Sequence, residues 1–489
     1  MFLRGPKRSR VKLTGYEHLA AGARHGRRSA CSRNRFATTR RIGYCREVLQ
    51  LLYTVLYALG FAVLSPMFLY KMWKRGKYRE NFWQRFGFYS EDLRQRLAQK
   101  KERRCWIQAV SVGEVNVALS LIGVLQRKFP DLRIIVTSTT STGYTQAYER
   151  LPQETELLYF PQDFPWCVRR AYDLIQPDFV VLMESELWPN HIWAGARSGI
   201  PLCLVNGRLS PRSERRYKRL GRFFRPVFRE LSLVCAQSQE DADNFIAIGV
   251  ARDRVHMTGN MKYDVSMPHA DAQLVDPVQL LKLIGVSPAQ PILVAGSTHP
   301  GEEEILFNVV ADLRRKFPRL FLILVPRHVE RTREVVDLAK RKQVKFILRS
   351  DISARLGQTA EPYDCLIVNT TGELKWFYKV ATVIFVGKSL VGEGGQNIVE
   401  AAVSGHPVTF GPNMQNFRAI AREFVAEDAC IQVPDAEGLR RAVEELLEDA
   451  NRRELIVAAA HRVIQSNVGA TDRSVELIAT ALSGTRSTA

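Results

Sequence analysis

Short runs of β-branched and aromatic residues alternate with amphipathic stretches along the chain from Cys105 onward. The stretches between the runs, such as Glu114–Phe129 and Glu240–Ile248, place apolar residues at helical spacing. Apolar strands that alternate with helices are typical of a parallel sheet covered on both faces. The first set of predicted strands comprises Cys105–Ala109, Arg133–Thr137, Leu157–Phe160, Phe179–Met183, Leu202–Asn206, Leu233–Ala236 and Val255–Thr258.

Residues 266–290 interrupt this alternation with three prolines and no strong period, which predicts a linker. A second set of predicted strands then follows, comprising Pro291–Ser297, Leu320–Val325, Lys345–Leu348, Asp364–Val368, Val383–Val386 and Pro407–Thr409. Two more amphipathic stretches, Asp435–Asp449 and Arg452–Ile464, predict cover helices. We therefore expect an α/β protein with two Rossmann-like, doubly wound parallel-sheet domains, at residues 80–265 and 291–489.

An uncharged segment of 23 residues, Val48–Tyr70, precedes the first domain. A helix of this length just spans a hydrocarbon core of about 30 Å. The basic and aromatic residues that follow it suit the anionic, cytoplasmic surface of a membrane. We predict an N-terminal membrane-anchor helix with a basic flank over residues 47–79. A helix inserted obliquely from one face, and a buried first helix of a soluble domain, are the alternatives.

The net charge of +20 lies mostly in the first 46 residues, which carry thirteen Lys or Arg and one acid. The rest of the chain is only mildly basic, which argues against nucleic acid as a partner. The basic segment is interpreted as a disordered arm, a transit peptide or sequence upstream of the true start. The eight cysteines have no metal-ligand spacing, which is typical of small core residues in a reducing compartment.

A glycine-rich turn follows the predicted strand that ends at Val386, with Gly387, Gly394 and Gly395 among its glycines. Asn397 is expected to open a short helix after it. Such a turn exposes backbone N–H groups to an anion, and a phosphate is the expected ligand. Glu400, one turn into the helix, would then bind ribose hydroxyls. The alternative is a turn that only packs.

Carboxylates follow two predicted strands of the first domain. Glu114 lies in the first turn of a helix, where it either complements the helix dipole or acts as a general base. Glu184 and Glu186 come directly after an apolar strand, and the alternation of side chains in an extended chain puts them on one side. They would handle protons or bind sugar hydroxyls, unless they only solvate a turn. Lys262 lies where the domain meets the linker and would neutralise an acidic ligand.

Polar residues also end the strands of the second domain. Arg327 follows one strand and is suited to a bidentate grip on a phosphate or carboxylate. Glu373 follows another strand and opens a helix. His299 and His328 lack the surrounding carboxylates of a metal site, so metal binding is not expected. These strand ends together suit one nucleotide-like anion.

Eight short motifs occur in order along the chain: SVGE at 111–114, ESELWPN at 184–190, NGRLS at 206–210, GNMKYD at 259–264, STH at 297–299, VPRH at 325–328, GEL at 372–374 and GGQNIVEA at 394–401. Over roughly residues 48–470 they resemble the 3-deoxy-D-manno-octulosonic acid (Kdo) transferases of Gram-negative lipopolysaccharide assembly. The resemblance implies a GT-B fold and an inverting, metal-independent transfer of Kdo from CMP-Kdo to the lipid A precursor, lipid IVA, without a cofactor. It also implies a single N-terminal anchor, with the catalytic domains on the cytoplasmic face of the inner membrane.

The resemblance also implies roles for individual residues. Glu114 would be the general base, and Glu184 and Lys262 would stabilise the transition state. The residues that would hold CMP are Pro326, Arg327, Gly372, Glu373, Leu374, Asn397, Ile398, Val399 and Glu400. Lys388 and Gln396 depart from the family pattern, which usually has a small residue and a His there. The rival hypotheses are another GT-B glycosyltransferase or epimerase that uses a UDP-sugar, and a membrane-bound adaptor without activity.

Overall fold

The computed structural model describes residues 46–67, 70, 81–267, 276–287, 289–352 and 362–484. The chain divides into two compact units, Met1–Tyr70 and Lys71–Ala489, which are described separately. The predicted basic arm, apart from its last residue, and the flank at 71–79 lie outside the described residues.

One helix, Arg46–Met67, is described in the first unit. It is 22 residues long, with a mean hydropathy of 1.9, and none of it is buried. Its exposed apolar side chains include Leu51, Leu59 and Val63. The predicted apolar N-terminal helix is confirmed, and by length and composition it is able to cross a membrane.

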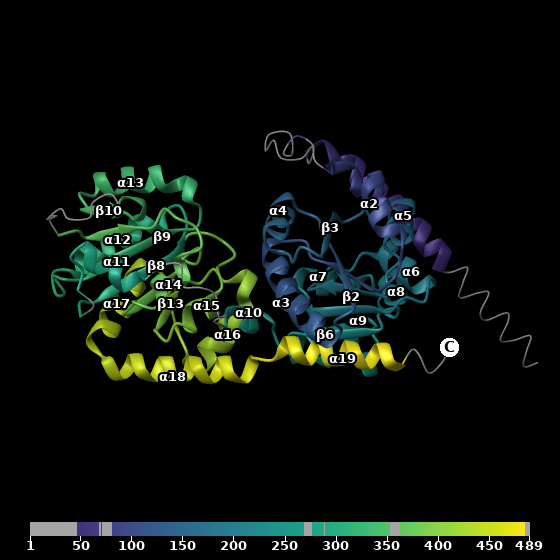
Figure 1. Ribbon diagram of the computed structural model, residues 1–489. Coiled ribbons are helices and arrows are strands. Elements are labelled where there is room, and N and C mark those ends of the chain that lie inside the picture. The colour runs from purple at the N-terminus through teal and green to yellow at the C-terminus, as the bar shows by residue number, and fades with distance from the viewer. Residues whose placement is uncertain are drawn as a thin grey trace, which may run out of the picture. The chain divides into compact units, whose positions relative to one another are not determined.

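The second unit contains two seven-stranded sheets, in which every paired strand is parallel. The first sheet has the order β3-β2-β1-β4-β5-β6-β7. Its strands are β1 (Arg103–Gln108), β2 (Leu132–Ser138), β3 (Glu156–Tyr159), β4 (Phe179–Met183), β5 (Leu202–Gly207), β6 (Leu233–Ala236) and β7 (Val255–Met257). Helices cover both faces of the sheet (Figure 1). Each of these strands lies within about two residues of its predicted position, because a strand buried on both faces is apolar throughout.

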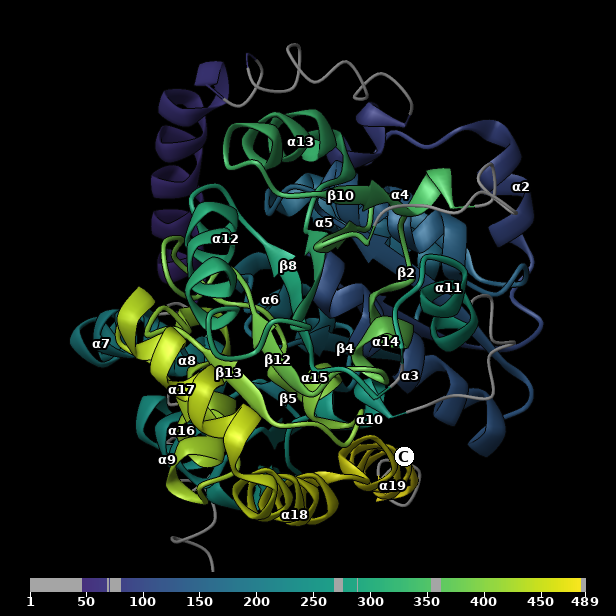
Figure 2. The same cartoon turned by 90° about the vertical axis from the view of Figure 1, so that its left-hand side faces the viewer.

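The second sheet has the order β10-β11-β9-β8-β12-β13-β14. Its strands are β8 (Ile292–Thr298), β9 (Phe321–Pro326), β10 (Phe346–Leu348), β11 (Cys365–Ile367), β12 (Val383–Val386), β13 (Val408–Phe410) and β14 (Ile431–Gln432). Figure 2 shows β8, β12 and β13 side by side. Strand β14 is not predicted from the sequence, because two residues are too short to give a pattern.

The helices follow the strands in βαβ order. Those up to the start of the second sheet are α2 (Glu91–Ala98), α3 (Val112–Lys128), α4 (Ser141–Arg150), α5 (Pro165–Ile175), α6 (Pro189–Arg197), α7 (Pro211–Arg219), α8 (Gly221–Phe228), α9 (Gln239–Ile248), α10 (Lys262–Ser266) and α11 (Pro277–Leu283). The later ones are α12 (Glu302–Leu313), α13 (Thr332–Arg341), α14 (Leu374–Tyr378), α15 (Ile398–Ala402), α16 (Arg418–Ala426), α17 (Ala436–Glu448), α18 (Ala450–Asn467) and α19 (Ala470–Gly484). The predicted α/β fold of two Rossmann-like domains is confirmed.

The predicted linker is partly structured. Helix α11 lies within it, capped by the Asp276 side chain. Leu281, Ile284 and Val286 are buried in the core of the second domain. This part of the segment therefore belongs to a folded domain.

The last two helices pack on different domains. In α18, Val463 and Ile464 enter the core of the second domain, whereas in α19 Val475 and Ile478 enter the core of the first. Figure 1 shows α18 beside α16 and α19 beside α3 and β6. The Asp264 carboxylate fixes the crossing, because it accepts hydrogen bonds from three donors at the start of α19. The sequence pattern assigned the whole C-terminal segment to the second domain.

The strand orders locate the ligand-binding edges. The strand order switches direction between β1 and β4 in the first sheet and between β8 and β12 in the second. Ligands of open α/β sheets bind beyond the carboxyl ends of the strands at such a switch point. The turns after these four strands are therefore where a site is expected.

Candidate active site

Glu114 lies in the first turn of α3, directly after β1. The Ser111 hydroxyl caps the helix by accepting from the Glu114 amide (3.4 Å). The Glu114 carboxylate accepts in turn from the Val110 amide (2.6 Å) and the Ser111 hydroxyl (3.4 Å). This reciprocal arrangement resembles a capping box, so Glu114 does support the helix start. The side chain is only 9% exposed, however, which is unusual for a residue that only caps.

Glu184 follows β4 and has a φ of 50°, a left-handed conformation that is uncommon outside glycine and often marks functional sites. Its carboxylate is buried between two cations. Lys262 Nζ lies 3.1 Å from one oxygen and Arg208 Nε lies 2.7 Å from the other. Arg208 comes from the turn after β5, and its role is not evident from the sequence because the pairing depends on the order of the strands.

The three carboxylates have different pKa values because their surroundings differ. Burial, with Glu184 and Glu186 as further causes, raises the pKa of Glu114 to about 8. Burial would also raise the pKa of Glu184, but Lys262 and Arg208 outweigh it and hold the pKa below its usual value. Burial raises the pKa of Glu186, against the hydrogen bond that the Trp188 indole donates. Neighbouring acids with separated pKa values are the usual basis of an acid–base pair in enzymes.

Lys262 begins α10 and connects the carboxylates to the second domain. Its Nζ lies 5.0 Å from the centre of the Phe417 ring as well as beside Glu184. Ser266, at the end of the same helix, accepts a hydrogen bond from the Asn397 side chain (3.0 Å). Helix α10 therefore touches both groups of residues that the sequence predicted as site residues.

The predicted CMP-binding residues lie in the turns after β9, β11 and β12, at one edge of the second sheet. Arg327, directly after β9, is exposed. Burial raises the pKa of the Glu400 carboxyl, and the nearby Arg327 cation offsets part of that rise. Glu373 occupies the N-cap position of α14 without a side-chain capping hydrogen bond, and Arg349 donates two hydrogen bonds to its carboxylate (2.9 and 3.2 Å). Arg349 is not predicted from the sequence, since an arginine after a short strand carries no signal of its own.

The remaining predicted residues contribute backbone rather than side chains. Pro326 ends β9, Ile398 and Val399 are buried, and Leu374 starts α14 half buried. Gly372 has a φ of 80°, which only glycine adopts readily. Any contact of Ile398 or Val399 with a ligand would be through the backbone, and of their two amides only that of Ile398 lacks a protein acceptor.

The glycine-rich turn is less open than predicted. Seven amides in and after it already donate to protein acceptors, namely those of Gly387, Lys388, Ser389, Leu390, Gly394, Gly395 and Val399. Among the described residues, six amides of this segment have no such acceptor, those of Val391, Gly392, Glu393, Gln396, Asn397 and Ile398. The prediction of free amides is therefore wrong for these seven amides and holds for the other six, which include those where Asn397 caps α15 as expected.

Glu302 explains why the turn is closed. This carboxylate in the first turn of α12 is fully buried and accepts from four backbone amides, those of His299 (2.9 Å), Lys388 (2.7 Å), Ser389 (2.9 Å) and Leu390 (3.0 Å). It thereby ties the turn after β8 to the turn after β12. Three consecutive acids at a helix start suggest only a dipole effect, so this contact is not evident from the residue pattern.

Comparisons with known proteins identify the relatives of this chain. Residues 80–265 match the family described as 3-Deoxy-D-manno-octulosonic-acid transferase (kdotransferase). The 3-deoxy-D-manno-octulosonic acid transferase of Haemophilus influenzae is 33% identical over 406 residues, which cover 83% of this chain and 92% of the relative. The enzyme of the same name from Bordetella pertussis is 30% identical over 437 residues, covering 86% and 98%.

Among solved structures, UDP-GlcNAc 2-epimerase from Neisseria meningitidis, bound to UDP-GlcNAc, has a TM-score of 0.55. It is 13% identical and the match covers 77% of this chain and 100% of the epimerase chain. At this identity the likeness shows the fold alone, a GT-B arrangement of two Rossmann-like domains.

Proposed function

The chain belongs to the 3-deoxy-D-manno-octulosonic acid transferase family and is a glycosyltransferase, and we propose that it transfers Kdo from CMP-Kdo to the lipid A precursor, lipid IVA. In this reaction a bond forms between an acceptor hydroxyl oxygen and the ketosidic carbon of Kdo. The bond from that carbon to the phosphate of CMP breaks, and CMP leaves with the electron pair. The hydroxyl proton passes to a base.

Glu114 is the proposed base, and its environment is the observation that carries the proposal. The carboxylate is buried beside Glu184 and Glu186, and its pKa is raised to about 8. A base with a pKa near the working pH combines a useful ionised fraction with a strong tendency to accept a proton. The hydrogen bonds from Val110 and Ser111 hold it in position.

Glu184 and Lys262 are the proposed stabilisers of the transition state. Displacement from a ketosidic carbon passes through an oxocarbenium-like state while negative charge grows on the departing phosphate. The ion pair is buried and Arg208 holds its other side, so it is fixed before substrate arrives. Preorganised charges of this kind need no rearrangement during the reaction.

The CMP group of the donor is proposed to bind at the edge of the second sheet. Arg327 supplies an exposed cation for the phosphate, and the amides of Gln396, Asn397 and Ile398 supply hydrogen-bond donors. Glu400 and Glu373 are available for hydroxyl or amino groups of the nucleoside, the latter fixed by Arg349.

The apolar helix Arg46–Met67 is the proposed anchor, with the catalytic domains on the cytoplasmic face of the inner membrane. Its length, composition and exposure support a membrane anchor. Removal of residues 48–70 is expected to impair transfer to acceptor embedded in membranes, and removal of residues 1–46 to leave activity nearly unchanged. Full activity of the first truncation on membrane-embedded acceptor would refute the anchor.

The test of the reaction is transfer of labelled Kdo, generated in situ as CMP-Kdo, to a tetraacyl lipid A precursor. Wild type and Glu114→Ala are compared, and mass spectrometry of the product counts the sugars added. Product from wild type alone supports both the reaction and the base. Equal product from both discards Glu114 as the base, and no product from folded wild type discards the reaction.

A thermal shift with CMP and UDP separates this proposal from the rival with a UDP-sugar. Stabilisation by CMP and not by UDP is expected. The opposite preference would favour the rival, and transfer of labelled Kdo excludes an adaptor without activity.

A further inference from the structure

Helices α7 and α8 carry most of the net charge of the folded protein. Residues 211–230 contain eight Lys or Arg and two acids, a net charge of +6, whereas residues 47–489 together have +8. Residues 47–489 are therefore only mildly basic on average, although one surface among them is strongly basic. We call the exposed side of the two helices the α7–α8 face. This face contains none of the proposed catalytic residues.

Five arginines of the α7–α8 face are exposed and have no carboxylate partner among the residues that the structure describes: Arg212, Arg219, Arg222, Arg225 and Arg229. Arg225 and Arg229 stand four residues apart at the end of α8, where like charges repel. The negative end of the α8 dipole offsets part of this repulsion, but no carboxylate in the described part of the chain pairs with either arginine. The arrangement is understandable if an external anion compensates it.

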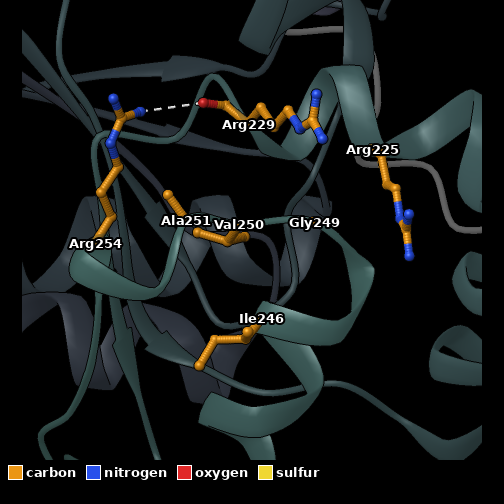
Figure 3. Close-up of a pocket in the computed structure, with 7 residues that line it drawn as sticks. All are labelled: Arg225, Arg229, Ile246, Gly249, Val250, Ala251 and Arg254. Carbon is orange, nitrogen blue, oxygen red and sulfur yellow. Dashed lines mark hydrogen bonds between the residues drawn. The ribbon is translucent and has the colours of Figure 1, made fainter.

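A hollow with three arginines in its lining lies at the end of α8. It has a volume of about 550 Å³ and is lined by Arg225, Arg229 and Arg254, with uncharged residues of α9 and the turn after it. Figure 3 shows Arg254 and Arg225 on opposite sides, and Arg254 donates a hydrogen bond to the Arg229 carbonyl oxygen (3.1 Å). None of the lining residues is acidic. The hollow suits a phosphate group of about headgroup size.

The face also has an apolar element. Leu220, between the two helices, is 48% exposed. Beneath it Tyr217, Phe224 and Phe228 pack their rings together, with centroids 4.8 to 5.8 Å apart. Helices with a cationic surface and an apolar side chain projecting from it are typical of proteins that lie on a lipid surface.

We propose that the α7–α8 face docks on an anionic lipid bilayer, with Leu220 entering the headgroup layer and lipid phosphates occupying the hollow. The unpaired arginines supply charge complementarity to such a surface, where each cation near the bilayer changes affinity about fivefold. Nucleic acid is a poorer fit, because stacking on bases needs exposed aromatic rings and the rings here are largely covered. This docking is separate from the anchor helix and does not depend on the proposed reaction.

The test places a local probe on the face of the full-length chain. Leu220→Cys is labelled with an environment-sensitive dye in a background of Cys31→Ser and Cys45→Ser, since the six other cysteines are buried. The labelled protein is mixed with vesicles of phosphatidylcholine alone, or with 30 mol% phosphatidylglycerol. A blue shift and a several-fold rise in dye emission are expected only with the anionic vesicles, and 0.5 M salt should reduce them.

Two matched variants carry the same loss of four charges. Arg219→Gln, Arg222→Gln, Arg225→Gln and Arg229→Gln together should abolish the response. Arg319→Gln, Arg333→Gln, Lys340→Gln and Arg341→Gln, all exposed in the second domain, should keep it. Melting temperatures check that both variants fold. Three outcomes would overturn the proposal. They are equal dye emission on both vesicle types, an unchanged response in the first variant, and a response to oligonucleotides in place of anionic vesicles.

Discussion

Glu114 and Glu302 occupy corresponding places in the two domains and do opposite things. Each lies in the first turn of the helix that follows the first strand of its domain. Glu302 is fully buried, and four backbone amides use its oxygens. Glu114 retains 9% exposure, receives one amide and one hydroxyl, and faces two other carboxylates.

The partners of a carboxylate, rather than its position in the fold, decide its role. A carboxylate saturated by amides is locked as an acceptor and holds two turns together. A carboxylate with few donors and like-charged neighbours binds a proton more readily, so it is suited to proton transfer. The following predictions test this contrast.

The largest expected effect is on the activity of Glu114→Gln. The amide side chain still offers an oxygen to the Val110 amide, so the helix cap is kept, but it has no base. We expect kcat to fall by about 10²- to 10⁴-fold. Kdo transfer kinetics measure this, and Glu91→Gln, an exposed acid in the first turn of α2, is the control that should leave kcat unchanged.

The same variant has a predicted pH dependence of stability. The pKa of Glu114 is about 8 in the folded chain against an ordinary value of 4.5, so the folded state binds the proton more tightly. The stability that this proton binding adds to the folded state is fully present below pH 4.5 and is lost as the pH rises through 8. Glu114→Gln should therefore melt closer to, or above, wild type as the pH increases from 5 to 9. If the melting temperature of Glu114→Gln instead fell further below that of wild type over this pH range, the raised pKa of Glu114 would be contradicted.

Glu302→Gln should affect stability more than chemistry. The substitution replaces one oxygen by an NH₂ group, which leaves two of the four amides without an acceptor. Each buried unsatisfied donor costs about 1–3 kcal/mol, so we expect the free energy of unfolding to fall by about 3 kcal/mol. KM for CMP-Kdo should rise more than kcat falls, because the turn after β12 loosens. Glu304→Gln, an exposed acid on the same helix, is the control; a similar loss there would show that Glu302 is not special.

The Glu184–Lys262 pair should show a moderate coupling. A double-mutant cycle with Glu184→Gln and Lys262→Met measures how far the two losses of stability fail to add. Residues in one buried ion pair typically couple by about 1–3 kcal/mol. Because Arg208 also holds Glu184, the single Lys262 variant should still fold. Additive losses would mean that the pair acts as two independent groups.

The smallest effect is a shift of the pH profile in Glu186→Gln. Ionised Glu186 raises the pKa of Glu114, so its removal should lower that pKa. The rise of kcat/KM with pH should move from near pH 8 to lower pH, by up to about one unit. The profile is measured for wild type and variant under the same ionic strength. A shift to higher pH would contradict the proposed interaction.

Much of this fold was accessible from residue patterns. Phe179–Met183, Leu233–Ala236 and Val383–Val386 were predicted with the bounds that the structure has, because buried strands are apolar throughout. Helix α11 was missed because its short apolar stripe lies among prolines. The candidate base was found from its position after a strand, but its choice over other acids rested on the family motif.

The sequence alone determined the two α/β domains, the apolar N-terminal helix and the family, since periodicity and short motifs are local properties of the chain. Three further features depend on the three-dimensional fold: Arg208 and Lys262 share Glu184, Glu302 closes the glycine-rich turn, and α19 returns to the first domain. These contacts join residues far apart in the chain. Which of them form depends on the order of strands in each sheet and on what is buried together, and neither is encoded in a local pattern.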